Sequence, residues 1–539
     1  MSATSLGSPA RSGNSTLALT GLIVAVSMTT IDQTIVALSA PTIESDLGIS
    51  HGAMQWVVNA YLLATAAFFL LGGRLSDLLG HKRMALIGIA GFGATSLLCS
   101  LAPHGSGATP WLIGARVLQG IAGAIMYPAA IGIVVEGFPR EGRAKAMARF
   151  FTITGAMTAI GPIAGGFLSQ WTWRSIFWIN VPLAITAFII VAIAAKPSER
   201  RREHLDLPGA VLIAAGLGLI VFGLQQAGST SWTSPTVIAS LIAGAALVVV
   251  FVLVEGRMSQ PLVKLAVFRD RGFAIATVSI LFASVAFLST FFFLSVYGQV
   301  SLNLNAVSTG ALFLKFFIGF AVAAQIGSRR FDQSGARRVL LVGGALGAIG
   351  FGWLAEAVTK IPAAPSDFFN AQTWPIMLAG AGIGFMLSAS STDAVNRSIG
   401  ASYGEVTAIS QTMRNFGGAL GIALLTTVVT DTLTSKLTTS FSKLGATAAD
   451  ARATVDSISG ANSGSDKALT ALPPAVRAQF VDAVQTGYAD SVSRAFVGAA
   501  IAMGVIVLLA LLYPKGQISS RGSDPVAGAA TSPADKVRS

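Results

Sequence analysis

The chain is short of charge, cysteine and histidine, and each shortage excludes a class of protein. Only 11% of its 539 residues are charged, a smaller share than soluble domains of this size carry. Cys99 is the single cysteine, which excludes an internal disulfide and a cysteine metal site. The four histidines lie in connecting segments, which argues against a buried metal or haem centre: His51, His81, His104 and His204. We therefore expect no cofactor and no metal.

Long apolar runs take the place of charge. Hydrophobic residues make up 53% of the chain, and the mean hydropathy is +0.69. Hydropathy predicts an all-α membrane protein with about fourteen helices of spanning length. Their approximate limits are 17–39, 54–72, 84–102, 110–135, 147–168, 176–195, 207–226, 236–255, 272–296, 307–327, 339–358, 373–394, 406–430 and 495–513.

The positive charges lie almost entirely on one side of the predicted membrane. The net charge is +12, yet the short loops of the other side hold only Arg174 and Lys360. Because basic loops stay in the cytoplasm, both termini are predicted to be cytoplasmic, in a multi-pass protein of the plasma (inner) membrane. This distribution explains the basic composition, and we expect no nucleic-acid partner.

Two ionisable residues of opposite sign fall inside predicted spans. Asp32 lies in the first span and Arg116 in the fourth, both near the outer end. At ~1.5 Å of rise per residue, each lies roughly 10 Å below the outer surface. An unpaired charge at that depth is costly, so the two are predicted to pair and to have a function. The alternative is a structural carboxylate whose hydrogen bonds come from neighbouring hydroxyl groups.

The stretch 155–166 reads GAMTAIGPIAGG and lies inside the fifth predicted span. At ~100° per residue, its small residues form one stripe on a helix. These are Gly155, Ala159, Pro162 and Gly166, with Gly161 and Gly165 beside them. Small residues let a second helix approach closely in lipid, so an ordinary tight helix crossing is one interpretation.

A short motif between the second and third spans recurs in the second half of the chain. Residues 77–83 read DLLGHKR, and residues 332–338 read DQSGARR. Gly73 precedes the first copy by one helical turn, whereas Ser328 stands at the equivalent place in the second. The repeat predicts two related halves.

In combination these motifs resemble those of the fourteen-span drug:proton antiporters of the major facilitator superfamily (QacA/EmrB type). The resemblance rests on the Asp32 segment, the 73–83 loop, Arg116-x2-Gln-Gly, the stretch 155–166 followed by WRSIFWINVP at 173–182, and the run from Gln411 to Gly421. One departure is Leu78, because the family often has a basic residue after the loop aspartate.

The resemblance implies a role for each motif. Asp32 and Arg116 would couple transport to protons. The antiporter motif would be Gly155, Gly161, Pro162, Gly165 and Gly166, and we expect Gly155, Ala159, Pro162 and Gly166 to line the contact between two helical bundles. The gating loops would comprise Gly73, Asp77, Gly80, Lys82, Arg83, Arg143, Asp332, Gly335, Arg337 and Arg338. Four polar residues in later spans are candidates for the substrate cavity: Lys315, Asp393, Arg414 and Asn415.

The implied domain organisation is two six-helix bundles with two extra helices between them. The expected parts are a cytoplasmic tail (1–16), the first bundle (17–202), the inserted pair (203–256), the second bundle (257–515, with an outer loop at 431–494) and a cytoplasmic tail (516–539). Within the outer loop, Val476, Phe480, Val484 and Tyr488 share a helical face, which predicts a helix lying on the bilayer.

The implied function is proton-coupled multidrug efflux by alternating access, of the kind that gives antibiotic resistance. The partners would be small amphiphilic substrates, protons and the lipid bilayer, and the chain would act as a monomer. It has no Gly-x4-Gly-Lys-Ser/Thr segment and is not expected to be an enzyme. Three alternatives stay open: a dedicated exporter or proton symporter of one metabolite, a membrane-embedded lipid-modifying enzyme, and a receptor or scaffold that transports nothing.

Overall fold

The fold is helical throughout the described part of the chain, which contains no strand. The computed structural model describes residues 14–514 except 139, 198–205, 259–260, 397–402, 444–446, 448, 450, 452–453 and 456–473. Most of the predicted tails therefore lies outside the described residues. Among the described residues, twelve helices are long and apolar enough to cross a membrane.

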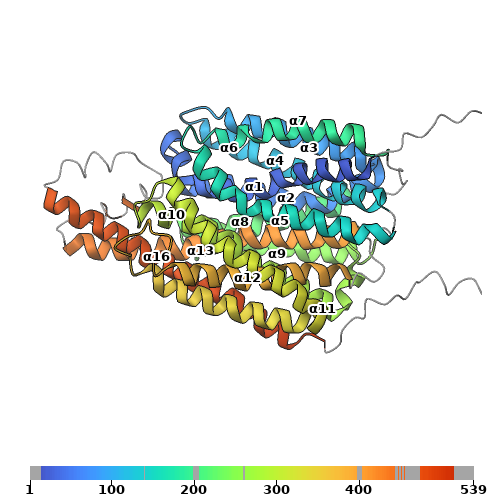
Figure 1. The fold of residues 1–539 in the computed structure, drawn as a ribbon. Coiled ribbons are helices and arrows are strands. Elements are labelled where there is room, and N and C mark those ends of the chain that lie inside the picture. Colours follow the sequence, from blue (N-terminus) through green and yellow to red (C-terminus); the bar gives the residue numbers. More distant parts are fainter. Residues whose placement is uncertain are drawn as a thin grey trace, which may run out of the picture.

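The helices of the first half pack on one another. α1 contacts α5 and α7, and α4 contacts both α2 and α3. Figure 1 shows these helices, blue to cyan, on one side of the molecule. Their bounds are α1 Ser15–Leu47, α2 His51–Leu79, α3 His81–Ser100, α4 Ala108–Gly137, α5 Arg140–Leu168, α6 Ser175–Trp178 and α7 Asn180–Ala194.

The helices of the second half form a matching group. α11 packs on α12 and α16, and α13 packs on α10 and α16. Their bounds are η1 Leu265–Arg269, α10 Arg271–Val300, α11 Ala306–Val358, α12 Thr373–Asn396, α13 Tyr403–Lys443 and α16 Pro474–Leu511. The two halves meet mainly along three helix pairs, which are α2 with α13, α5 with α11, and α1 with α10, with smaller contacts of α4 with α13 and of α1 with α11.

Short polar side chains begin several of these helices. Each accepts a hydrogen bond from a backbone N–H of the first turn, which otherwise has no partner inside the helix, and such a cap is worth about 0.5–2 kcal/mol. The caps are Asn14 on α1, Ser50 on α2, Asp206 on α8 (Leu207–Ser229), Asp270 on α10 and Asn305 on α11. Uncharged caps at Asn14, Ser50 and Asn305 add no net charge near the membrane.

Two predicted spans, 147–168 and 373–394, are not among the twelve. Both stretches are nevertheless helical, within α5 and α12. The part 373–387 of α12 is apolar but shorter than a full span. Each of the other predicted stretches matches one of the twelve, extending past it by two residues at most.

The inserted pair contacts both halves. α8 (Leu207–Ser229) packs on α9 (Pro235–Glu255), on α2 and on α13. Gln225 of α8 accepts a hydrogen bond from Asn59 Nδ2 of α2 at 3.2 Å and donates one to the Gly52 carbonyl oxygen, also at 3.2 Å. On the other side, Thr427 of α13 donates to the Leu224 carbonyl oxygen of α8 at 3.2 Å. Neighbouring residues of α8 are thus bonded to different halves.

The repeated loop motif adopts the same local geometry twice. Gly80 and Gly335 have φ angles of 93° and 76°, a conformation that favours glycine. Gly335 also interrupts the helical backbone of α11, near the boundary between the candidate spans 307–331 and 333–358. Lys82 Nζ donates to the carbonyl oxygens of Ala192 and Ala195 at the end of α7. At the equivalent place, Arg337 donates to the carbonyl oxygens of residues 510 and 511 at the end of α16.

The outer segment differs from its prediction. α13 and α16 continue past the predicted span limits and pack side by side (Figure 1). Phe480 and Tyr488 are buried, the ring of Phe480 lies 4.6 Å from that of Phe441, and Lys436 pairs with Asp490 at 2.6 Å. The expectation of a helix lying on the bilayer was wrong, because its apolar face packs on the extension of α13.

Candidate functional site

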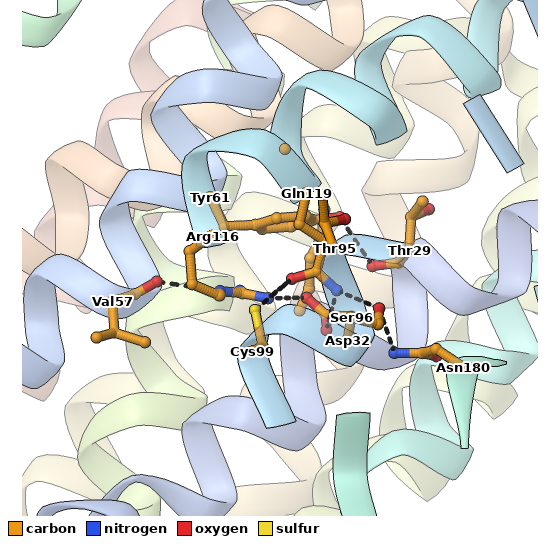
Figure 2. Close-up of polar contacts among 12 residues, drawn as sticks. Thr29, Asp32, Val57, Tyr61, Thr95, Ser96, Cys99, Arg116, Gln119 and Asn180 are labelled. Carbon is orange, nitrogen blue, oxygen red and sulfur yellow. Dashed lines mark hydrogen bonds and ion pairs between the residues drawn. The ribbon is translucent and has the colours of Figure 1, made fainter. Parts of the chain in front are cut away.

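Asp32 and Arg116 form a fully buried ion pair between α1 and α4. The guanidinium Nη1 donates to the Asp32 carboxylate, and the side chains are 0% and 1% exposed. Figure 2 shows the two side chains pointing toward each other inside the first half. The predicted pairing is therefore present in the structure. Burying such a pair is favourable only when its remaining donors and acceptors are also satisfied.

Gln119 provides hydrogen-bond partners for both members of the ion pair. It lies one turn after Arg116 in α4, accepts from Arg116 Nη1 at 2.6 Å, and donates to Asp32 Oδ1 at 3.1 Å. Its amide nitrogen also lies 2.8 Å from Ser96 Oγ, and Asn180 Nδ2 donates to the same hydroxyl at 3.3 Å. The carboxylate is thus connected to α3 and to the first turn of α7 (Figure 2).

Tyr61 of α2 lies between this pair and the space between the halves. The Arg116 guanidinium carbon stands 4.3 Å from the centre of its ring, which is within the range of a cation–π contact. Arg116 Nε donates to the Val57 carbonyl oxygen at 3.1 Å, so α2 holds the arginine in two ways. The Tyr61 hydroxyl group donates to the Thr29 carbonyl oxygen of α1 at 3.4 Å.

A small central cavity lies between the halves, next to Tyr61. Its volume is about 10 Å³, room for about one water molecule. The structure is therefore occluded at this point. The lining residues come from α1, α2, α4 and α13: Thr29, Thr30, Gln33, Tyr61, Thr65, Phe69, Gly123, Tyr127, Gln411, Arg414 and Asn415.

The two halves are hydrogen-bonded across this cavity. Gln33 Nε2 of α1 donates to Asn415 Oδ1 of α13 at 3.1 Å. Thr412 Oγ1 donates to the Ala66 carbonyl oxygen of α2 at 3.0 Å, also between the halves. Arg414 and Asn415, two of the four predicted cavity residues, do line the cavity.

The other two predicted cavity residues do not line it. Lys315 is buried, and its ammonium donates to the Asp367 carbonyl oxygen at 3.3 Å and to Asn370 at 3.5 Å, both in the loop before α12. Asp393 accepts from the hydroxyl group of Tyr513, past the end of α16. The sequence placed Lys315 near the middle of its span and Asp393 near the inner end of its span, where a plain interfacial role was the alternative. In the structure, Lys315 bonds the loop before α12 and Asp393 bonds Tyr513.

The glycines of the antiporter motif face two directions. A Cβ on Gly161 would lie 2.0 Å from Thr34 Oγ1, and one on Gly165 would lie 2.7 Å from the Ile35 side chain. Both glycines therefore pack on α1 inside the first half. Gly155 is exposed and has no heavy atom within 4 Å of such a Cβ. Gly166 is buried, and the Pro162 side chain is outside the described part.

The residues after this motif connect helix ends on one side of the first half. Asp46 at the end of α1 accepts from Trp173 Nε1 at 2.7 Å and from Arg174 Nη1 at 2.9 Å. Arg174 also donates to the Ala102 carbonyl oxygen at 3.2 Å. The Trp-Arg pair thus links α1, the end of α3 and the loop after α5.

The first gating loop contains a histidine between two acids. His81 Nε2 lies 3.7 Å from Asp77 Oδ1 and 3.2 Å from Glu136 Oε1 of α4. Gly73 lies where α2 crosses α13, since its Cβ would be 4.0 Å from Ala408. Arg83 and Arg338 are exposed. The side chains of Arg143 and Asp332 lie outside the described residues, so their predicted roles stay predictions.

Gln33, Gln119 and Ser96 were not predicted as site residues, although Gln119 belongs to the Arg116-x2-Gln-Gly motif. A usable signal existed for Gln119, because three residues along a helix bring it beside Arg116. For Gln33 the signal was an amide inside a span, next to the buried aspartate. Nothing in the sequence pattern distinguishes Ser96 from the other hydroxyl-bearing residues of α3.

Comparison with known proteins agrees with this architecture. The profile of the Major Facilitator Superfamily matches residues 22–422. The chain is 34% identical over 420 residues to the puromycin resistance protein of Streptomyces alboniger, covering 76% of this chain and 81% of that protein. It is 31% identical over 431 residues to the cephamycin export protein of Amycolatopsis lactamdurans, covering 78% and 86%.

A solved structure shares the fold at low sequence identity. A bacterial homologue of the human lysosomal transporter Spinster, inward-facing and unoccupied, superposes with a TM-score of 0.59 at 14% identity, covering 94% of this chain and 98% of that one. The profile match spans most of the chain, and the two relatives match at more than 30% identity. The chain therefore belongs to the Major Facilitator Superfamily and is a membrane transporter, not an enzyme.

Proposed function

We propose that this chain exports amphiphilic organic compounds in exchange for protons, by alternating access. The observation that carries the proposal is the buried Asp32–Arg116 pair, separated from the cavity between the halves by the ring of Tyr61. A carboxylate at membrane depth can take up and release a proton, and a proton-driven carrier needs such a group. The resistance and export named in the two relatives supports outward transport of organic compounds.

The proposed topology has fourteen spans and both termini in the cytoplasm. In it, α5 and α12 join the twelve apolar helices as spans, and a single chain is the transporting unit. Two bundles, 17–202 and 257–515, flank the inserted pair 203–256. The equivalent contacts of Lys82 and Arg337 support two related bundles, and the position of the basic residues supports the orientation.

The coupling step acts on the charge of Asp32. As a carboxylate, Asp32 accepts hydrogen bonds from Arg116 and Gln119 and holds α1 against α4. A proton on Asp32 removes its charge, and with it most of the attraction to the guanidinium. Gln33 lies in the same turn of α1 as Asp32, and its side chain donates to Asn415 of the other half. A movement of α1 would therefore also change the Gln33–Asn415 hydrogen bond at the cavity.

Transport by the purified chain tests the proposal. Expression should first be compared with an empty vector for growth in a panel of antibiotics and dyes, which identifies transported compounds. When a proton gradient is imposed, the chain in liposomes should then accumulate such a compound against the compound's own gradient, while protons move down theirs in the opposite direction. A symporter would move compound and protons in the same direction. A receptor or scaffold would move neither, and either result contradicts the proposal.

A further inference from the structure

Arg414 carries the only charge among the described residues that line the central cavity. The remaining lining side chains are hydroxyl groups, amides, aromatic rings and a glycine. The nearest carboxylate of the site, on Asp32, already accepts from Arg116 and Gln119 and is 0% exposed. The cavity is therefore positive.

The guanidinium of Arg414 is held by weak contacts. Its nearest ring contact is Phe287 of α10, with the guanidinium carbon 5.7 Å from the ring centre. Its Nε is buried and has no hydrogen-bond partner among the described residues. The neighbouring amide of Asn415 is already used, since it accepts from Gln33 and donates to the Gln411 carbonyl oxygen. Arg414 thus keeps donors available at the surface where the two halves separate.

An arginine without a carboxylate is costly at membrane depth, so its presence needs a compensating anion during the working cycle. The guanidinium fork matches the two oxygens of a carboxylate or a similar oxyanion. Phe69 and Tyr127, which also line the cavity, offer aromatic surface beside it. We propose that Arg414 binds the acidic group of the transported amphiphile, so that this chain prefers anionic over cationic amphiphiles.

This inference rests on the proposed function and specifies its substrate class. A cavity lined by one cation and no carboxylate repels a positively charged compound, since no lining group would compensate its charge. Opening the halves would expose the lining residues together. A ligand anion would then replace the weak contact of Arg414 with Phe287.

A matched set of head groups tests the proposal. Pyrenebutyrate, pyrenebutanol and pyrenebutylamine share one apolar body and carry a negative, neutral or positive head group. Their binding to the full chain in lipid nanodiscs should be measured by equilibrium dialysis, with protein-free nanodiscs subtracted. We expect the acid to bind about tenfold or more tightly than the amine, the effect of one charge-assisted contact.

Variants then assign the preference to Arg414. Arg414→Gln should remove the preference for the acid while leaving pyrenebutanol binding unchanged within about twofold, and Arg414→Lys should keep part of it. Lys315→Gln is the matched control, a buried cation of the same half that does not line the cavity, and it should keep the full preference.

The outcomes are separable from those of the proposed function. A wild-type chain that binds the acid no better than the amine, or an Arg414→Gln chain that keeps the preference, overturns the assignment of Arg414. If Arg414→Gln cannot be purified in folded form, Arg414→Lys alone is compared with the wild type. A preference for the acid equal to that of the wild type would then contradict a two-point contact between Arg414 and the acidic group. Proton exchange with other compounds would survive all of these results, whereas a chain that exchanges no protons refutes the proposed function itself.

Discussion

Gln33, the residue directly after Asp32 in α1, donates a hydrogen bond to Asn415 in α13 at 3.1 Å. The two neighbouring side chains therefore contact different partners, Asp32 inside the first half and Gln33 in the second. Because both leave the same helical turn, a rotation of α1 that displaces the carboxylate also displaces the amide. This arrangement joins the proposed proton site to a contact between the two halves at the cavity.

Removing that contact should favour opening of the cavity. Gln33→Leu and Asn415→Leu should each raise the fraction of open molecules, and the double variant should raise it no further, because each single change already removes the bond. Electron–electron distances between spin labels on the two halves measure the fractions, in a chain whose buried Cys99 is replaced by serine. Additive effects of the two changes would show that the bond does not hold the halves.

Asp32→Asn should separate binding from proton coupling. The amide can still hydrogen-bond Gln119 but carries no charge and takes up no proton in the working pH range. We expect substrate binding and exchange without a gradient to persist, and proton-driven accumulation to fall to the level of protein-free liposomes. Accumulation against a gradient by this variant would place the coupling proton elsewhere.

Asp32→Ala provides the stability comparison for the same site. Both variants leave Arg116 buried without a carboxylate, which costs about 3–5 kcal/mol for pairs of this kind. Alanine additionally removes the oxygen that accepts from Arg116 and Gln119, whereas asparagine keeps one acceptor oxygen. The alanine variant should therefore unfold at a clearly lower temperature than the asparagine variant in the same lipid. Equal unfolding temperatures would mean that Arg116 finds another partner when Asp32 is lost.

Two glycines of the antiporter motif offer a matched pair of substitutions. Gly161→Ala places a methyl group 2.0 Å from Thr34 Oγ1, within a crossing that also brings the Ile31 carbonyl oxygen to 3.0 Å. Overpacking of this kind costs about 1–3 kcal/mol. Gly155→Ala meets no atom within 4 Å and should leave stability unchanged or raise it. Thermal unfolding of both variants decides, and a Gly161→Ala chain as stable as the wild type contradicts the tight crossing.

The loop aspartate should act without a basic neighbour. Asp77→Ala should shift the population toward the inward-facing state, since it removes the carboxylate beside His81 at the end of α2. Leu78→Arg should have little effect, because the loop is already closed by Asp77 and by Lys82 at the end of α7. Labelling of a cysteine placed on the outer side measures the shift. If Asp77→Ala leaves that labelling unchanged, the loop serves only to orient the chain in the membrane.

The sequence predicted the parts of the site that depend on depth and local geometry. Equal depth in two spans was enough to pair Asp32 with Arg116. The two copies of the loop motif were enough to predict equivalent positions for Gly80 and Gly335, which both have a positive φ. Side-chain choice could not be predicted in the same way. Gln119 completes the network only because its rotamer reaches both Asp32 and Ser96, which helix spacing does not specify.

Other misses arose where segments distant in sequence meet. A central lysine in a span indicates a cavity, but Lys315 instead bonds the loop before α12, whose path the sequence does not reveal. The apolar face that contains Phe480 fits lipid and protein equally well by its periodicity. The face packs on protein because α13 continues beyond the predicted span and brings Phe441 against Phe480.

The inserted helix α8 constrains how the two halves can move. Its residues 224 and 225 bond α13 and α2, respectively, so α8 cannot stay attached to both helices when these separate. Among the hydrogen bonds of the described residues given above, the Gln225 side chain makes two to α2, and α13 makes one to α8 through Thr427. Because of this difference, we expect α8 and α9 to move together with the first half during transport. The contact that changes in each cycle would then be the one between α8 and α13.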